Sequence, residues 1–345
     1  MDLITISRLR AYRSCPRKEH YRYALCVKPL TTAEIIRFGT LFHDGKEAWR
    51  IARMEGGDPL DRALTTIHER WQADEQADEF ELARVELAMI GYHHRYVDEP
   101  FKVLAVEAEF SMPLINPHTG RASRTWRQAG KIDAIVQDLR DGRIYAEETK
   151  TTGADITAGS PYWERLRIDG QISLYIDGAR SLGFEAEGCL YDVIKRPAQR
   201  QLQATPEDKR KYRKDGGLYA SQRAEDETPA EFRARVAEAI AADPEGYYVR
   251  GTVVRMGDEL EAARRNVWLY ARMIHDTRDH AAELFNPGAC MQFGSPCSYW
   301  PVCSGEASLE DRSRYTVADS PHTELSQTQE PKEEAEDVEQ QVANL

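Results

Sequence analysis

Residues 130–151 read GKIDAIVQDLRDGRIYAEETKT, and this stretch decides the fold. Residues 130–136 and 144–151 read as two strands. Asp141-Gly142 lies between them, and this dipeptide between two such runs is a strong signal for a hairpin turn. The sequence therefore predicts two antiparallel strands joined by a tight turn.

Three charged residues on this hairpin form a candidate site. Asp133 lies on the first strand, and Glu148 and Lys150 lie on the second. Residues two apart in a strand face the same side, so Glu148 and Lys150 project together while Glu147 points the other way. The hairpin can bring Asp133 beside them, which would gather two carboxylates and one ammonium group.

These groups suit the hydrolysis of phosphodiesters. Mg²⁺ and Mn²⁺ prefer oxygen ligands. A bound metal lowers the pKa of its water and neutralises the charge that develops on the phosphate. The lysine can orient the water or stabilise the transition state. From these residues alone the simpler alternative, that all three are solvated strand residues, stays open.

The sequence around the hairpin predicts a β-β-β-α-β core preceded by helices. Apolar and polar residues alternate from 104 to 112, which indicates a half-buried strand before the hairpin. After the hairpin, residues 161–182 read as a helix and residues 188–195 as a strand. Apolar residues at helical spacing predict N-terminal helices over residues 7–25, 35–54, 60–71 and 80–96.

The C-terminal half predicts further elements and then a tail. Thr228-Pro229-Ala230-Glu231 combines a cap, a first-turn proline and an acidic residue, which is typical of a helix start. Residues 247–255 predict a strand, and residues 259–284 predict a long helix. Residues after Glu306 are rich in Ser, Thr, Glu and Gln and poor in large apolar groups, so we expect disorder there.

The charge distribution separates an acidic tail from a nearly balanced body. The net charge is −12, and residues 306–345 contribute −8 of it through 11 acidic and 3 basic residues, which leaves −4 for the other 305. The total charge therefore does not argue against nucleic acid. No apolar run of about 18 residues and no secretory signal are visible, so we expect a cytoplasmic protein without a membrane span.

Two further residues complete a pattern that resembles a known family. Gln171 and Tyr175 are four apart, so they share a helix face and can donate hydrogen bonds to a phosphate or a base. The order Gly-x-x-Asp, Glu-x-Lys, Gln-x3-Tyr resembles the RecB-like branch of the PD-(D/E)XK nucleases, and the resemblance runs from about residue 7 to residue 304. That branch includes CRISPR-associated four-cysteine exonucleases, AddB-type nuclease domains and many phage exonucleases.

The resemblance implies an α/β, restriction-endonuclease-like core, in which helices flank a mixed central sheet. Gly39-Thr40-Leu41-Phe42-His43 resembles the histidine motif of this family, so His43 would join two carboxylates as a ligand for Mg²⁺ or Mn²⁺. An acidic residue often precedes the Asp motif by one strand, and Glu107 is the better match, although its membership of the site stays open. The residues to which the resemblance assigns catalysis are Asp133, Glu148, Lys150, Gln171 and Tyr175, and the metal ligands are His43, Asp133 and Glu148.

The cysteines suggest a second metal centre. Cys290, Cys297 and Cys303 fall within fourteen residues in a loop rich in turn formers. Three thiolates are one too few for a [4Fe–4S] cluster, which normally takes four. The family often places the fourth in an N-terminal Cys-Pro motif, so the resemblance implies Cys15, which precedes Pro16. Zinc bound by four cysteines is the alternative.

These expectations divide the chain into five regions. They are an N-terminal helical region with the first cluster cysteine (1–100), the nuclease core (101–196), a basic insertion followed by a strand and a helix (197–285), a cysteine segment (286–305) and a disordered acidic tail (306–345). In the insertion, residues 209–214 combine cations with an aromatic ring, which suits either a phosphate backbone and a stacked base or a solvated polar loop.

The sequence therefore predicts a metal-dependent DNA nuclease with an iron–sulfur cluster. We expect an exonuclease that acts on DNA ends in recombination, replication or repair, as phage enzymes do. One alternative is a catalytically idle iron–sulfur scaffold that binds DNA, and another is a CRISPR adaptation nuclease. The candidate partners besides DNA are a single-strand annealing protein and a helicase, which would be a separate chain.

Overall fold

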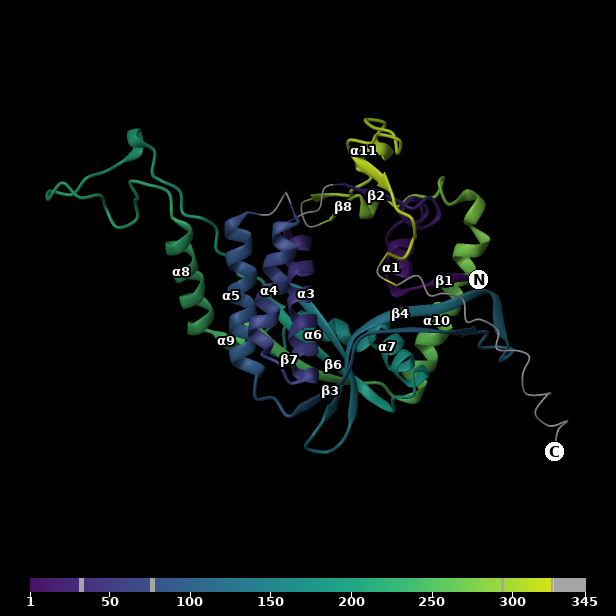
Figure 1. Ribbon diagram of the computed structural model, residues 1–345. Helices are drawn as coiled ribbons and strands as arrows, with labels where there is room; N and C mark the ends of the chain where they lie inside the picture. Colours follow the sequence, from purple (N-terminus) through teal and green to yellow (C-terminus); the bar gives the residue numbers. More distant parts are fainter. Residues whose placement is uncertain (31–33, 75–77, 293–294, 324, 326–345) are drawn as a thin grey trace.

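The computed structural model describes residues 1–30, 34–74, 78–292, 295–323 and 325 (Figure 1). Its centre is a mixed six-stranded sheet, in which β3, β4, β5, β6 and β7 follow one another. β1 runs parallel to the first part of β4, and β5 runs parallel to β6, while the other pairs are antiparallel. The strands of this sheet are β1 (Asp2–Ile4), β3 (Phe101–Ile115), β4 (Ala122–Asp138), β5 (Ile144–Thr152), β6 (Ala186–Lys195) and β7 (Tyr248–Val254).

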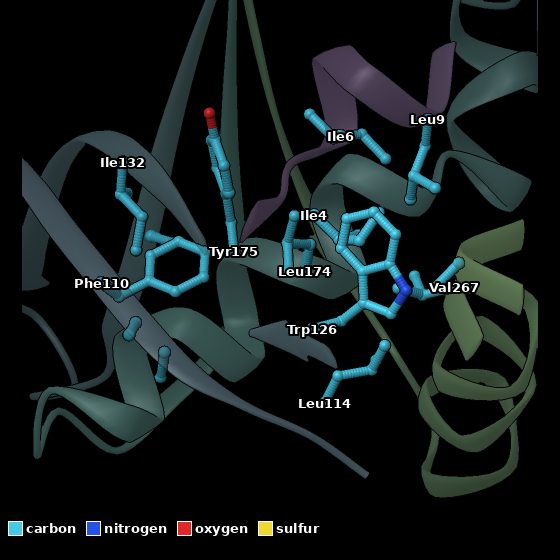
Figure 2. Packing of buried hydrophobic residues seen from close by; sticks show 14 of the residues in the cluster. Ile4, Ile6, Leu9, Phe110, Leu114, Trp126, Ile132, Leu174, Tyr175 and Val267 are labelled. Atoms are coloured by element: carbon cyan, nitrogen blue, oxygen red, sulfur yellow. The ribbon is translucent and has the colours of Figure 1, made fainter. Parts of the chain in front are cut away.

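Helices cover both faces of the sheet. On one face, α1 (Ile6–Ser14), α7 (Gly170–Ser181) and α10 (Gly257–Asp276) enclose an apolar core with residues of β3 and β4, part of which Figure 2 shows. The helices packed together on the other side are α3 (Glu34–Glu55), α4 (Pro59–Gln72), α5 (Glu79–Tyr96) and α8 (Pro229–Ala242). The predicted α/β class with a mixed central sheet flanked by helices is confirmed.

The hairpin that carries the candidate site forms as its sequence predicts. Asp138 donates its backbone N–H to Arg143 across the turn, and Gly142 takes a φ of +79°, which favours glycine. Gly130 is required in the middle of β4, because a Cβ there would lie 2.8 Å from the ring of Phe110. Figure 2 shows this ring beside Tyr175 and Ile132, at the edge of the core.

The predicted helix over residues 7–25 is interrupted. Thr5 caps α1 by accepting a hydrogen bond from the N–H of Arg8. Cys15 is extended, with φ −164° and ψ 118°, because a residue before proline is driven out of the helical region. α2 (Pro16–Glu19) and a π-helical turn (His20–Ala24) follow, so Cys15 lies in a break between two helices.

Other boundaries also differ from the prediction. The helix expected over residues 161–182 is split into α6 (Pro161–Glu164), a 3-10 turn and α7, because Asp169 adopts an extended backbone and caps α7 with its side chain. α10 ends at Asp276, eight residues before the predicted end. The capping box at Thr228 and Glu231 is present at the start of α8, and α9 (Pro244–Tyr247) follows it.

The tail after Glu306 is not disordered throughout. β10 (Tyr315–Val317) pairs with β2 (Val27–Pro29), and the Tyr315 ring stacks on the ring of Tyr299. The average composition of the tail does not reveal this strand, because Tyr315 is its only aromatic residue. The prediction of disorder is therefore wrong for this strand, and residues 326–345 lie outside the described residues.

The remaining elements are short. β8 (Met291–Gln292) and β9 (Ser295–Pro296) form a small two-stranded ladder, and α11 (Trp300–Cys303) follows them. In the part of the chain that the structure describes, no helix has the length and apolar character needed to span a membrane.

Candidate nuclease site

Asp133 lies where β4 and β5 separate. The ladder between these strands runs from Gln137 and Ile144 to Ala134 and Glu147. At the next position, a side chain replaces the backbone as hydrogen-bond acceptor: Oδ2 of Asp133 accepts the backbone N–H of Thr149 at 2.8 Å. The end of the ladder therefore holds this carboxylate in a defined position against β5.

Glu148 and Lys150 share one face of β5, as strand alternation predicts. Lys150 Nζ forms an ion pair with Glu148, whose side chain is 1% exposed. Both carboxylate oxygens of Glu148 are buried: Oε1 contacts the Lys150 ammonium, and Oε2 accepts no hydrogen bond from a described residue. Burial lowers the pKa of Lys150 to about 8, although the charge of Asp133 opposes this shift. The two carboxylates and the ammonium group thus meet at the end of the hairpin.

His43 reaches the same point from α3. Its Nδ1 lies 3.6 Å from Oδ2 of Asp133, and its side chain is partly exposed. Burial nevertheless lowers the pKa of His43, against the opposing charge of Asp133, which favours the neutral imidazole that can bind a metal. α3 can approach β5 closely because Gly39 lies against Thr151, where a Cβ would come within 3.0 Å of Oγ1.

Glu107 lies in the same cavity as His43 and Asp133. It is one of two non-glycine residues with a positive φ among the described residues, at 49°, and it pairs with Lys131. Burial raises the pKa of Glu107 to about 7. Glu47, one turn after His43, also lines the cavity, and burial raises its pKa as well. Strained and electrostatically perturbed residues of this kind cluster at functional sites.

Gln171 and Tyr175 lie together on α7. The Gln171 side-chain amide donates to the Tyr175 hydroxyl at 2.9 Å, and both residues are buried. Figure 2 shows the Tyr175 hydroxyl pointing out of the apolar core. Burial and the nearby charge of Asp133 raise the pKa of Tyr175, so this hydroxyl keeps its proton.

Arg10 on α1 was not among the predicted site residues. Its guanidinium contacts both oxygens of Asp169, the residue that caps α7, at 3.2 Å. Its charge is close enough to contribute to the lowered pKa of Lys150. No signal in the sequence singles out Arg10, because only the packing of α1 against α7 brings it to the hairpin.

A model of the PD-(D/E)XK nuclease superfamily matches residues 4–304. The chain belongs to this superfamily. The match covers the hairpin, α3 and α7, and therefore every residue of the candidate site. A search of curated proteins returned no match.

Members of the PD-(D/E)XK superfamily typically use Mg²⁺ or Mn²⁺, and the donors present here fit such an ion. Asp133 and Glu148 offer carboxylate oxygens: Oε1 of Glu148 pairs with Lys150, and its Oε2 is buried without a hydrogen bond from the described residues, which suits a metal ligand. His43 adds an imidazole. Within the described residues, however, no three His, Cys, Asp or Glu side chains are already grouped to hold an ion.

A buried ion network, which the sequence did not predict, adjoins the candidate nuclease site, and its Lys46, Arg50 and Glu147 line the same cavity as His43 and Asp133. Lys46, one turn after His43, donates to Glu147 at 2.8 Å and to Asp192 at 2.7 Å. It also donates to the Thr149 hydroxyl at 2.6 Å, and Thr149 is the residue that binds Asp133. The members of the network are Lys46, Arg50, Glu99, Glu147, Asp192 and Arg250.

Charge balance explains how the network can be buried. Its six members are three cations and three carboxylates, Arg53 also lies 3.9 Å from Glu99 at the edge of the network, and the Tyr92 hydroxyl donates to Asp192 at 2.7 Å. Burial alone would raise the pKa of Glu147, but Arg50 and Lys46 hold it at about 2. The network therefore stays ionised, and it fixes α3 to β5 beside the site.

The four candidate cluster cysteines surround one cavity of this nuclease. Cys15, Cys290, Cys297 and Cys303 all line it, together with Tyr21 and Tyr299. Burial and then the charges of the three other cysteines raise the pKa of Cys290. The finding that no three such side chains among the described residues are grouped to hold an ion applies to these four thiols as well. The segment around Ser14 contacts the segment around Asn286 here, because the Asn286 side-chain amide donates to the Ser14 carbonyl at 2.9 Å.

The two other cysteines lie elsewhere. Cys189 is fully buried on β6, as expected of a core residue. Cys26 is only partly buried and takes a φ of 55°, so it lies outside the apolar core. The extended conformation at Cys15 explains how one N-terminal thiol can leave the helix and face the C-terminal segment.

Proposed function

We propose that this PD-(D/E)XK chain is a Mg²⁺- or Mn²⁺-dependent DNA nuclease of the RecB-like branch that acts on DNA ends. One observation carries the proposal: Asp133 is bonded to the Thr149 N–H of β5 and lies 3.6 Å from His43 of α3, next to the Glu148–Lys150 ion pair of the same strand. The order of these residues along the chain also resembles the RecB-like pattern, which supports the assignment to that branch.

Each residue has a role in the proposed reaction. Asp133, Glu148 and His43 would hold the metal. When bound, Mg²⁺ or Mn²⁺ supplies an activated water and neutralises charge on the scissile phosphate. Lys150 orients the attacking water and stabilises the negative charge that develops on the phosphate oxygens. Gln171 and Tyr175 act as a hydrogen-bonded pair of donors at the edge of the site.

A cleavage assay tests this function directly. The substrates are end-labelled linear and covalently closed circular DNA, each single- and double-stranded, with Mg²⁺, with Mn²⁺ and with EDTA. We expect metal-dependent release of nucleotides from linear DNA and no cleavage of circles. Cleavage of circles would replace the exonuclease by an endonuclease, and no cleavage of any DNA would overturn the proposal.

We expect His43→Ala to lower the rate of cleavage and to raise the concentration of Mg²⁺ or Mn²⁺ that half-maximal activity requires. The reason is that the variant removes one ligand and leaves both carboxylates. The measurement is the cleavage rate as a function of metal concentration. His118→Ala, in the exposed turn between β3 and β4, is the control. A normal rate at limiting metal would show that His43 has only a structural role.

We further propose that Cys15, Cys290, Cys297 and Cys303 bind a [4Fe–4S] cluster. Four thiols around one cavity are the donor set of such a cluster, and the same set also fits zinc. Nearly the whole nuclease core lies between Cys15 and Cys290, so a metal bound by all four would close the chain around it. Loop-closure entropy grows slowly with length, and metal binding would contribute to folding.

Purification without oxygen tests the cluster. We expect brown protein with a broad absorption band near about 400 nm that bleaches on reduction. Each Cys→Ala change among the four should remove the colour and lower the melting temperature, whereas Cys26→Ala and Cys189→Ala should keep the colour. Colourless protein with one zinc per chain would replace the cluster by a zinc site, and protein with neither metal would refute the site.

A further inference from the structure

A projecting arm, residues 196–227, is unlike the rest of the molecule. It joins β6 to α8 and contains little regular structure beyond one 3-10 turn. Figure 1 shows it extending beyond α8, away from the central sheet. The chain as a whole carries a net charge of −12, but residues 209–219 of this arm contain five cations and one carboxylate. This local excess of positive charge needs an explanation.

The arm begins at the end of the sheet that carries the candidate nuclease site. Lys195 at the end of β6 pairs with Thr152 of β5, two residues after Lys150. The N–H of Arg196 then donates to the Thr152 carbonyl at 2.7 Å. A strand of nucleic acid that leaves the site at this end of the sheet therefore leaves it at the root of the arm.

The other end of the arm is anchored to α8. Glu227 is buried and accepts two hydrogen bonds from the Arg235 guanidinium, each at 2.7 Å. The same arginine donates to the Arg200 carbonyl at 2.8 Å. These contacts hold the two ends of the arm side by side, so the tip projects from a fixed base.

The tip has a defined backbone. Tyr212 and Leu218 form an antiparallel bridge, and the N–H of Arg213 donates to the Gly217 carbonyl at 2.7 Å. The Gln222 side chain clamps the backbone by accepting from the N–H of Lys211 and donating to the carbonyl of Lys209. Such hydrogen bonds pre-arrange the side chains of the tip and reduce the entropy lost on binding.

The side chains of the tip are available to a ligand. Lys209, Lys211 and Lys214 are exposed, and none of the three forms an ion pair with a described residue. Tyr212 and Tyr219 are 60% and 51% exposed, and neither ring packs on another aromatic ring of the described chain. Unpaired cations with exposed aromatic rings are the groups that bind a phosphate backbone and stack on bases.

We propose that the tip of this arm, residues 209–219, is a second DNA-binding site that holds the phosphodiester backbone outside the nuclease site. The inference rests on the proposed function as a DNA nuclease. Lys209, Lys211 and Lys214 neutralise phosphates, and Tyr212 and Tyr219 stack on unpaired bases, which favours a single strand over a duplex. The arm keeps the enzyme on its substrate between cleavage events.

The test measures binding of the full-length chain to fluorescein-labelled dT30 and to a 30-base-pair duplex by anisotropy at several KCl concentrations. Every protein carries Asp133→Asn, so that the DNA is not digested. The first variant replaces Lys209, Lys211 and Lys214 by Ala. For three lost phosphate contacts, we expect the slope of log K against log salt to become shallower by about 2 for dT30 and by about 3 for the duplex.

A second variant separates stacking from charge. Tyr212→Ala with Tyr219→Ala should weaken binding to dT30 by at least about fivefold while leaving the salt slope unchanged. The control replaces Lys102, Arg121 and Arg124, three exposed cations of β3, β4 and the turn between them, by Ala and should keep both affinity and slope. Weaker duplex binding without weaker dT30 binding in the lysine variant would assign the tip to duplex DNA.

The experiment distinguishes a failure of the arm proposal from a failure of the proposed nuclease function. Equal affinity and salt slope in the parent and the lysine variant would overturn the arm proposal, even if the unmutated chain cleaves DNA. A chain that cleaves no DNA would overturn the proposed function, and the anisotropy comparison would still decide whether the tip binds DNA. A change of the same size in the control variant would show that the effect is not specific to the tip and would also overturn the proposal.

Discussion

Asp133→Asn is expected to reduce DNA cleavage to background, and Lys150→Met to reduce it by at least about a hundredfold, the cost of one lost transition-state donor. Asn keeps an oxygen that can accept the N–H of Thr149, so the first change removes the negative charge with little effect on the end of the ladder. Met keeps the length of the lysine side chain and removes its ammonium group. The measurement is the rate of cleavage at saturating metal.

Folding and binding must be measured beside the rate. Asp133→Asn should keep its melting temperature within a few degrees, because it removes no apolar packing. Lys150→Met leaves the buried Glu148 without its ion-pair partner, so its melting temperature should fall and its rate is measured on the folded fraction. Both variants should bind DNA in EDTA, since phosphate contacts elsewhere remain. Lys102→Met, an exposed lysine on β3, is the matched control and should cleave at the normal rate. Undiminished activity in purified Asp133→Asn or Lys150→Met would remove that residue from the mechanism.

The hairpin could be predicted from sequence because its signals are local. Asp141-Gly142 determines the turn, and the period of two in a strand determines which side chains share a face. Those two rules are enough to place Glu148 with Lys150 and to turn Glu147 away. They also bring Asp133 to the same end of the sheet, where the structure has it bonded to β5.

The buried ion network could not be predicted because its signals are not local. Lys46 and Arg50 read as ordinary charged residues of an amphipathic helix, and their partners lie about a hundred residues away on β5. Charged residues are almost never fully buried unless they are paired, and pairing is a property of the folded chain. Strand alternation indicated only that Glu147 faces the opposite side of the sheet from Glu148, and it did not identify the residues that cover that side.

In the N-terminal segment, the helical spacing of the apolar residues led to a prediction of one helix, although the proline at position 16 already indicated a break. Helical spacing extends through residue 25 and favours one long helix. Pro16 restricts the backbone of Cys15, which alone is enough to break the helix there. The break turns the Cys15 thiol towards the cavity that Cys290, Cys297 and Cys303 share. The proline is therefore part of the reason why a four-cysteine site can form.

Lys46→Met is expected to destabilise the protein by about 3–5 kcal/mol, the usual cost of removing one partner from a buried ion pair. The side chain is 4% exposed and bonds to two carboxylates that have no access to water. Without its charge, the shared partner of Glu147 and Asp192 is lost, and each of these buried carboxylates keeps one arginine as its ion-pair partner. The measurement is the free energy of unfolding in urea, for which Arg62→Met is the control because the pair of Arg62 with Glu55 is exposed and worth at most about 1 kcal/mol.

A double-mutant cycle shows whether the loss comes from the charge or from the change of shape. Asp192→Asn alone should also destabilise the protein, because Lys46 and Arg250 lose their shared partner. Combining it with Lys46→Met restores equal numbers of buried cations and carboxylates, so the double variant should be more stable than the sum of the single losses predicts. Additive losses would mean that Lys46 acts through packing alone. The folded fraction of Lys46→Met should also cleave DNA more slowly, since Lys46 holds the Thr149 side chain and Thr149 holds Asp133.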